Sequence, residues 1–248
     1  MPHVLTLTAD EADVLRKGGV ILRQCLAHLA TLVAPGMQTA DLDEEAETFI
    51  RDHGAAPAFK GYRDYPATLC TSVNEQCVHG IPGAYALAEG DIISIDCGVL
   101  FEGLYTDSCI TVGVGRIDDL SRRLIDAATR ALERALDVVR AGVHVGDISS
   151  TIQQEVESRG FSPVPALTGH GIGRSLHQFP DIPNVGKAGT GAVIPAGAAI
   201  AIEPIIAAGK GEVYEAGDGW TLIATDGSRC AHMEHTVLVT EDGCDVIA

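Results

Sequence analysis

The first fifty residues have apolar positions at helical spacing. Thr8 and Glu11 have the spacing of a capping box, and apolar residues then recur every three or four positions as far as Gly36. This pattern predicts a helix that begins after Thr8 and ends before Gly36. It also predicts a second helix, capped by Asp41 and ended by Gly54. The chain therefore opens with two consecutive amphipathic helices.

The same arrangement returns about a hundred residues later. A long helix is predicted from Leu120 to about Gly142, and a short one from Asp147 to Gly160. Caps, stops and apolar positions of the two helix pairs lie 106 residues apart: Val33/Val139, Gly36/Gly142, Asp41/Asp147, Leu42/Ile148 and Gly54/Gly160. We therefore predict an internal duplication, with halves of about 8–113 and 117–242, within one domain over residues 1–248.

Each predicted half also contains an apolar strand that carries a carboxylate. The segment Ile92–Phe101, IISIDCGVLF, has the composition of a buried strand with a polar insertion at Asp96. Gly90 precedes Asp96 by the same interval at which Gly197 precedes Glu203. The fold class that follows is α+β, with two halves related by a pseudo-twofold axis and their equivalent carboxylates close to that axis.

Composition and charge narrow the possible partners. Of the 248 residues 34 are acidic and 17 basic, and the net charge of −17 repels phosphate, which argues against direct binding of nucleic acid or an anionic membrane. No apolar run approaches the roughly 18 residues of a membrane helix, and the first residues lack the pattern of a secretory signal. Seven scattered cysteines without a CxxC pair fit free thiols, so we expect a cytoplasmic protein.

Four acidic residues occur where an ionised side chain is costly. Each adjoins or interrupts an apolar strand, so it must be paired or bound to a metal ion if it is buried; these residues are Asp96, Asp107, Glu203 and Glu234. Taken singly, each also has a simpler explanation as a turn, cap or strand-end residue. As a set, they form a candidate metal site.

Histidine adds a nitrogen ligand to this set. The glycine-rich segment TGHGIGRSLH contains His170 and His177, and its loop-like backbone suits a ligand better than a packed helix face. Its Gly-x-Gly pattern lacks the strand–turn–helix frame of a dinucleotide fingerprint. Oxygen ligands with a single imidazole favour Mn²⁺, Fe²⁺, Co²⁺, Ni²⁺ or Zn²⁺. Four carboxylates exceed the need of one ion, so we expect two divalent metal ions bridged by shared carboxylates.

The ligand set and four sequence stretches closely resemble the methionine aminopeptidase family, bacterial type I. The stretches are IDCGVLFEGLYTDS, GHGIGR, IEP and MEHT, and the resemblance runs from about Thr8 to the C-terminus. It implies a pita-bread fold, with two related α+β halves around a central antiparallel sheet, in a single catalytic domain. It also implies that Asp96 binds one metal, that His170 and Glu203 bind the other, and that both metals share Asp107 and Glu234.

The resemblance further implies an activity and its catalytic residues. Members of the family remove the N-terminal methionine from nascent proteins and peptides when the second residue is small, by attack of a water that the metals activate. Glu203 corresponds to the residue that shuttles the proton, His79 to a histidine near the leaving nitrogen, and His177 to one that hydrogen-bonds the substrate carbonyl. Because the chain begins Met1-Pro2, the same rule predicts that it processes itself.

The implied methionine pocket matches the family less closely. Aromatic walls suit a polarisable thioether, and the residues at pocket positions are Tyr62, Tyr65, Cys70 and Trp220. Phe59 stands where the common bacterial pattern has a cysteine, and Leu176 stands where it has a phenylalanine. Phe59 is larger than the cysteine that it replaces, and Leu176 is smaller than the phenylalanine. We therefore expect a methionine pocket of similar volume with altered side-chain contacts.

Two other functions are compatible with the same fold. A Xaa-Pro dipeptidase or aminopeptidase shares fold and ligands but usually has a large additional N-terminal domain, whereas few residues precede the first predicted helix here. A metal-free interaction scaffold is the second alternative, and the intact ligand set argues against it. We expect a monomer. The implied role is compatible with ribosome contact, although no basic patch supports it.

Overall fold

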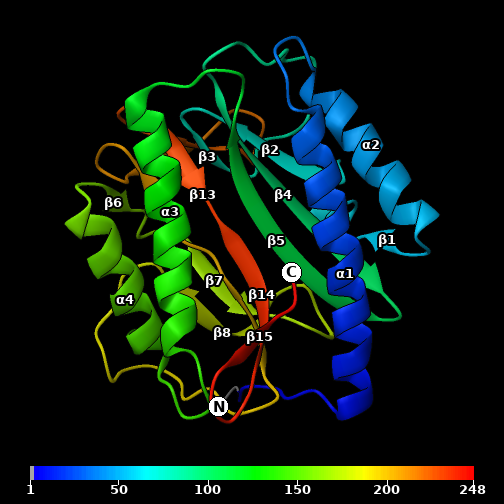
Figure 1. Cartoon of the computed structure of the whole chain (residues 1–248), viewed down its shortest axis with the longest axis vertical. Helices are drawn as coiled ribbons and strands as arrows, with labels where there is room; N and C mark the ends of the chain where they lie inside the picture. The colour runs from blue at the N-terminus through cyan, green and yellow to red at the C-terminus, as the bar shows by residue number, and fades with distance from the viewer. Residues whose placement is uncertain (1–2) are drawn as a thin grey trace.

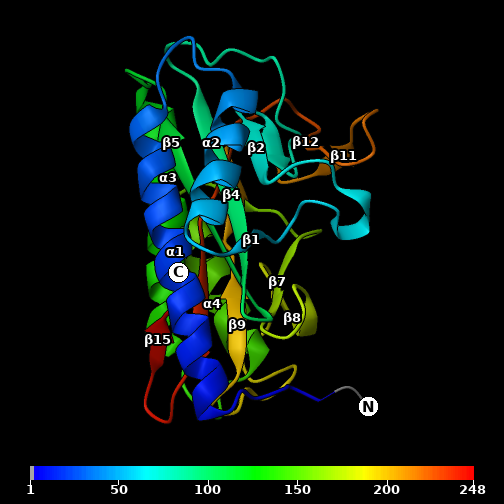
Figure 2. The ribbon, with the colours of Figure 1, turned by 90° about the vertical axis from the view of Figure 1, so that its right-hand side faces the viewer.

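The computed structural model describes residues 3–248 and consists of helices packed on one side of a central sheet (Figures 1 and 2). Met1 and Pro2, on which the prediction of self-processing rests, lie outside the described residues. The α-helices of the described part are α1 (Ala9–Leu32), α2 (Thr39–Asp52), α3 (Asp119–Val138) and α4 (Val145–Ser158). Within residues 3–248, no helix has a stretch long and apolar enough to cross a membrane.

The central sheet has nine strands, and every registered pair in it is antiparallel. Its main path is β1 (Ala56–Pro57), β4 (Ile92–Phe101), β5 (Leu104–Gly113), β14 (Glu234–Val239), β9 (Ala199–Ile202), β7 (Thr168–Gly171) and β8 (Gln178–Pro183). Two strands lie off this path: β2 (Leu69–Val73) pairs with β4, and β15 (Cys244–Val246) pairs with β14. The bounds of β4 agree with the strand predicted from IISIDCGVLF.

Two small sheets complete the molecule. One contains β13 (Cys230–His232), β10 (Ile205–Ala207) and β6 (Ser162–Pro163), and the other contains β11 (Val213–Glu215), β12 (Leu222–Ala224) and β3 (Gln76–Val78). Figure 2 shows α1 and α3 on one side of the central sheet, with β11 and β12 on the other. A short 3-10 turn, Tyr62–Asp64, also belongs to the described structure.

The two halves are built alike. Helices α2 and α4 each have 14 residues and begin at positions 106 apart. The glycine before each of them, Gly36 or Gly142, has a positive φ of 93° or 86°, a conformation that glycine adopts without steric cost. One apolar core joins α1 and α2 to β4, and a second joins α3 and α4 to β9 and β14. The helices therefore cover the sheet with one core per half.

The helix caps were predicted with mixed success. The capping box of α1 is confirmed: the backbone N–H of Thr8 donates to Glu11 Oε2 at 2.7 Å, and that of Glu11 donates to Thr8 Oγ1 at 3.3 Å. The predicted caps of α2 and α4 were wrong, because Asp41 and Asp147 are the third residues of these helices. Their carboxylates instead accept hydrogen bonds from the backbone of the residues that precede the helices.

Isolated β-bridges to distant segments explain this shift. Gln38 and His144, the actual N-cap residues, form β-bridges with Ala86 and Val193, respectively. A bridge holds the N-cap residue in extended conformation, and the helix begins at the next position. The repeat therefore extends to these bridges, which occupy the same place in both halves.

Candidate metal centre

Three adjacent strands carry carboxylates on one face of the central sheet. Asp96 of β4 lies opposite Cys109 of β5, and Glu234 of β14 lies opposite Cys109 from the other side. Asp107 precedes Cys109 by two positions, and alternate residues of a strand point to the same face. The register therefore brings Asp96, Asp107 and Glu234 together, although they are up to 138 positions apart in the sequence.

The second half supplies the remaining predicted ligands. His170 lies opposite Ala201 in the pairing of β7 with β9, and Glu203 follows two positions after Ala201. The backbone at His170 is not the loop expected from its glycine-rich surroundings, because it pairs with both β8 and β9. His177 does lie in the connection between β7 and β8. Strand pairing thus fixes the direction of the His170 ring toward the carboxylates.

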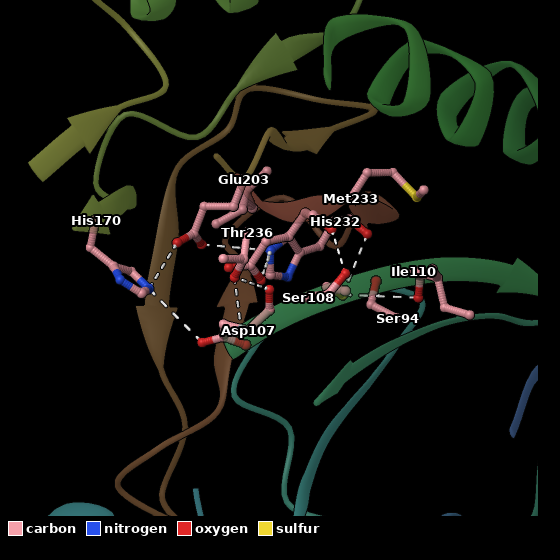
Figure 3. A network of polar contacts seen from close by, with 12 residues as sticks. Ser94, Asp107, Ser108, Ile110, His170, Glu203, His232, Met233 and Thr236 are labelled. Carbon is pink, nitrogen blue, oxygen red and sulfur yellow. Dashed lines mark hydrogen bonds and ion pairs between the residues drawn. The ribbon is translucent and has the colours of Figure 1, made fainter. Parts of the chain in front are cut away.

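The His170 imidazole faces two carboxylates (Figure 3). Its Nε2 lies 3.7 Å from Glu203 Oε1 and 3.9 Å from Asp107 Oδ2. Its Nδ1 lies 3.0 Å from the carbonyl oxygen of Gly171. A hydrogen bond from Nδ1–H to that carbonyl leaves the lone pair of Nε2 directed at the carboxylates, as metal-binding histidines require. Donor atoms of Asp107, His170 and Glu234 all lie within 4.8 Å of one another.

A second imidazole belongs to the cluster, and the sequence analysis missed it. His232 Nε2 lies 3.5 Å from Glu203 Oε2 and 3.5 Å from Glu234 Oε2. Together, Glu203, His232 and Glu234 form a second group of potential ligands within 4.8 Å. The cluster therefore contains one imidazole more than the set singled out from the sequence. The signal was present in HMEH, where His232 precedes Glu234 by two positions and so faces the same way.

Burial makes the carboxylate cluster costly without cations. Asp107 and Glu234 are only 4% and 2% exposed. Burial, and then the charges of neighbouring carboxylates, raise the pKa values of Asp107, Glu203 and Glu234 well above their ordinary range. Burial raises the pKa of Asp96 to about 7. The direction of these shifts shows that ionised carboxylates at these positions are costly unless cations offset their charge.

Unsatisfied polar atoms indicate what the cluster is built to hold. Among the buried side-chain atoms of residues 3–248 that lack a hydrogen-bond partner, four belong to this cluster: Asp96 Oδ1, Asp107 Oδ1, Glu234 Oε1 and His232 Nε2. Buried polar atoms are normally hydrogen-bonded, and exceptions need an explanation such as an ion. Carboxylate oxygens and imidazole nitrogens suit borderline divalent cations. The donor set therefore fits the divalent metal ions inferred from the sequence.

A cavity of about 380 Å³ adjoins the carboxylates and also includes every other predicted site residue. These residues are Phe59, Tyr62, Tyr65, Cys70, His79, Leu176, His177 and Trp220. Other lining residues were not singled out in the sequence, among them Arg63, Leu167, Asp181 and Ile205. These residue types are common in the chain and belong to no recognisable motif, so only the fold shows that they line the cavity.

Two histidines line the cavity beside the metal-ligand cluster. His79 has a φ of +59°, a left-handed conformation that is strained for a residue with a side chain and is enriched at functional sites. His177 Nδ1 lies 2.8 Å from the hydroxyl of Tyr62. Desolvation, then the charges of His170, Arg63 and His79, lower the pKa of His177 to about 3, so its ring is neutral at pH 7.

The aromatic part of the cavity accommodates the two residues that depart from the family pattern. Tyr65 and Trp220 meet edge to face, with ring centroids 5.0 Å apart. A Cβ added to Gly98 would approach Phe59 Cε1 to 2.6 Å, so the absence of a side chain at Gly98 makes room for the Phe59 ring. Leu176 is 2% exposed and packs in the same apolar cluster.

Comparison with known proteins agrees with this geometry. The model of metallopeptidase family M24 matches residues 13–241. A methionine aminopeptidase of Clostridium perfringens is 42% identical over 98% of both chains. The crystal structure of a methionine aminopeptidase from Thermotoga maritima is 39% identical, superimposes with a TM-score of 0.97 and covers 98% of both chains.

The chain belongs to metallopeptidase family M24. It is therefore a hydrolase, and its two-halved α+β architecture is the pita-bread fold. A prolidase from Pyrococcus furiosus shares this fold with a TM-score of 0.80 at 21% identity, and the match covers 98% of this chain but 64% of the prolidase. That likeness concerns the fold alone.

Membership of family M24 accounts for the carboxylate cluster. Family members are metallopeptidases, and the buried donor atoms without partners are of the types that bind divalent metals. A hydrolase needs an activated water, a proton carrier and a donor to the substrate carbonyl. Carboxylates, imidazoles and apolar side chains all line the same cavity.

Proposed function

We propose that the protein is a methionine aminopeptidase that removes N-terminal methionine from nascent polypeptides and peptides when the second residue is small. The observation that carries this proposal is the arrangement of one cavity, in which an aromatic pocket around Tyr65 and Trp220 opens onto buried carboxylates. The pocket suits an unbranched thioether side chain. The methionine aminopeptidases among the relatives add support through their near-complete coverage.

Two divalent ions are proposed to occupy the centre, drawn from Co²⁺, Mn²⁺, Fe²⁺, Zn²⁺ or Ni²⁺. Asp96 would hold one ion, His170 and Glu203 the other, and Asp107 and Glu234 would be shared. When bound, the metals would lower the pKa of water and polarise the scissile carbonyl. Shared carboxylates are supported by the position of Glu234, which belongs to both groups of potential ligands.

Glu203 is proposed to carry the proton. Burial and the charges of Asp107 and Asp96 raise its pKa, so a Glu203 carboxylate kept ionised by bound cations would have a high affinity for a proton from water. The same carboxyl group can then protonate the leaving amine. His79, which lines the cavity nearby, is proposed to contact the nitrogen of the leaving peptide.

His177 is proposed to donate a hydrogen bond to the substrate carbonyl. In the tautomer proposed here, the Tyr62 hydroxyl donates to Nδ1, 2.8 Å away, and the hydrogen of the neutral ring is on Nε2. An N–H aimed at the developing oxyanion stabilises the transition state more than the ground state. The pocket residues Phe59, Tyr62, Tyr65, Cys70, Leu176 and Trp220 are proposed to hold the methionine side chain.

Peptide specificity tests this assignment. The metal-loaded protein is expected to release methionine from Met-Gly-Ser rapidly, from Met-Leu-Ser slowly, and to leave Ala-Pro intact. Preference for Ala-Pro or Met-Pro would instead assign a Xaa-Pro peptidase. Absence of cleavage with every metal tried would favour an interaction scaffold, against which the intact ligand set argues.

The proposed substrates also suggest where and how the protein works. Nascent chains emerge in the cytoplasm, and we place the protein there as a monomer. A net charge of −17 gives no support for direct binding to nucleic acid. Contact with the ribosome therefore requires a protein surface as partner, which co-sedimentation with salt-washed ribosomes would detect.

A further inference from the structure

The position of His232 has a consequence for the metal centre. Its Nε2 lies between two carboxylates, 3.5 Å from Glu203 Oε2 and 3.5 Å from Glu234 Oε2. The residue is 2% exposed, and this nitrogen has no hydrogen-bond partner in the described part of the chain. A buried imidazole nitrogen that faces two carboxylate oxygens is stable either when it forms a hydrogen bond with them or when it binds a cation together with them.

The distances favour a cation. Hydrogen bonds between nitrogen and oxygen span about 2.7–3.2 Å, so 3.5 Å is too long for a good one. Zinc-like ions bind nitrogen and oxygen at about 2.1 Å, and two ligands of a tetrahedral ion at that distance lie about 3.4 Å apart. The 3.5 Å distances from His232 Nε2 to the Glu203 and Glu234 oxygens match this ligand–ligand distance.

Glu203 lies between two imidazoles. Its Oε1 is 3.7 Å from His170 Nε2, and its Oε2 is 3.5 Å from His232 Nε2 (Figure 3). Each potential ligand group thus has its own imidazole, and both groups include Glu234. The carboxylate of Glu203 can contact an ion on either side, with one nitrogen donor for each.

The backbone of His232 is held rigidly. Its N–H donates to Thr111 Oγ1 at 2.9 Å, and its carbonyl accepts from the same hydroxyl at 2.7 Å. His232 also lies opposite Ile205 in the pairing of β13 with β10. Metal ligands held by surrounding hydrogen bonds need little reorganisation on binding.

We propose that His232 is an additional protein ligand of the metal centre and binds a divalent cation through Nε2, together with Glu203 and Glu234. The proposal rests on the metal centre that the proposed function requires. It extends that centre from five protein ligands to six and gives it a second nitrogen donor, beside Glu203. A site with two imidazoles favours later transition metals over Mg²⁺ or Ca²⁺.

Diffraction from crystals loaded with Co²⁺ tests the proposal directly. Anomalous scattering is expected to place an ion within about 2.3 Å of His232 Nε2. The proposal is overturned if every ion lies more than about 3 Å from that nitrogen, or if no ion contacts Glu203 and Glu234. Methionine release from Met-Gly-Ser by the same preparation is measured separately. If methionine is released but no ion contacts His232, the proposed function stands and only the proposal of a sixth ligand is overturned.

A solution experiment with a matched control avoids dependence on crystals. His232→Gln is expected to weaken Co²⁺ binding at least about tenfold and to change the visible absorption of the bound ion. His235→Gln, next to Glu234 but on the opposite face of β14, is expected to change neither. Equal affinities and spectra for wild type and His232→Gln would contradict the proposal. Circular dichroism of both variants shows whether they fold.

Discussion

Asp96 and Glu234 lie opposite the same residue, Cys109, from the two strands that flank β5. Cys109 is fully buried, and its side chain points to the same face of the sheet as the two carboxylates. Strand pairing across three strands thus brings together acids from both halves of the chain. The arrangement of the metal centre therefore depends on how β4, β5 and β14 pair. A substitution at Cys109, between the two carboxylates, should alter metal binding.

Enlarging Cys109 tests this relationship. Cys109→Leu adds volume to a close-packed site and is expected to push Asp96 and Glu234 apart, weakening Mn²⁺ binding at least about tenfold, with a stability loss of about 1–3 kcal/mol. Cys109→Ala, the matched control, keeps the spacing and should bind Mn²⁺ like the wild type. Isothermal titration calorimetry measures both. Equal affinities for Leu and Ala variants would show that Cys109 does not set the geometry.

Loss of a ligand should remove activity without unfolding the protein. Asp96→Asn and His170→Ala are expected to lower kcat by about 10³-fold or more, since metal contacts stabilise the transition state by several kcal/mol. Their circular dichroism should stay near that of the wild type, because the two apolar cores lie between helices and sheet. Global unfolding of either variant would mean that the metals hold the fold.

The stability of the metal-stripped protein should fall as pH rises from about 4 to 7. Asp96 has a pKa near 3.8 when unfolded and about 7 when folded. In that interval the folded chain retains a proton that the unfolded chain has released, so Asp96 alone lowers the free energy of unfolding by about 1 kcal/mol per pH unit. The raised pKa values of Asp107, Glu203 and Glu234 act in the same direction. Thermal melts in EDTA measure this slope.

Two controls check the origin of the slope. Asp96→Asn cannot ionise and should have a flatter pH dependence between pH 4 and 7. Saturating Mn²⁺ should abolish or reverse the loss, because a cation stabilises the ionised carboxylates. A stability that rises with pH in EDTA would contradict the assigned direction of the pKa shift.

Tyr62 should act on catalysis through His177. Tyr62→Phe removes the hydroxyl that lies 2.8 Å from His177 Nδ1 and keeps the aromatic ring in the pocket. We expect kcat to fall about tenfold, the equivalent of one hydrogen bond of about 1.4 kcal/mol, with little change in KM. Tyr214→Phe, at a residue 52% exposed on β11, is the control. A change confined to KM would assign Tyr62 to binding only.

Much of this site could be predicted from the sequence because its signals are local. Apolar runs marked β4 and β9, and a carboxylate within or after each run is unusual enough to indicate chemistry. The capping box of α1 involves residues three positions apart, so it could also be predicted from the sequence. The pairing of these distant segments came from the repeat and from the family resemblance.

The features that were missed depend on distant partners. The true N-cap of α2, Gln38, is fixed by a bridge to Ala86, 48 positions away. The spacing of HMEH relates His232 to Glu234, but the 3.5 Å distance between His232 and Glu203 joins residues 29 positions apart and depends on the pairing of distant strands. The strand at His170 was likewise hidden, because glycines favour loops unless both neighbouring strands supply hydrogen bonds.

The most direct test of the account is methionine release by the metal-stripped protein as Mn²⁺ or Co²⁺ is added back. Release from Met-Gly-Ser should be absent in chelator and should rise in step with the amount of metal bound per chain. Bound metal should be lost in a variant that combines Asp107→Asn with Glu234→Gln. Release that persists in chelator, or full occupancy of the metal centre without any release, would contradict the account.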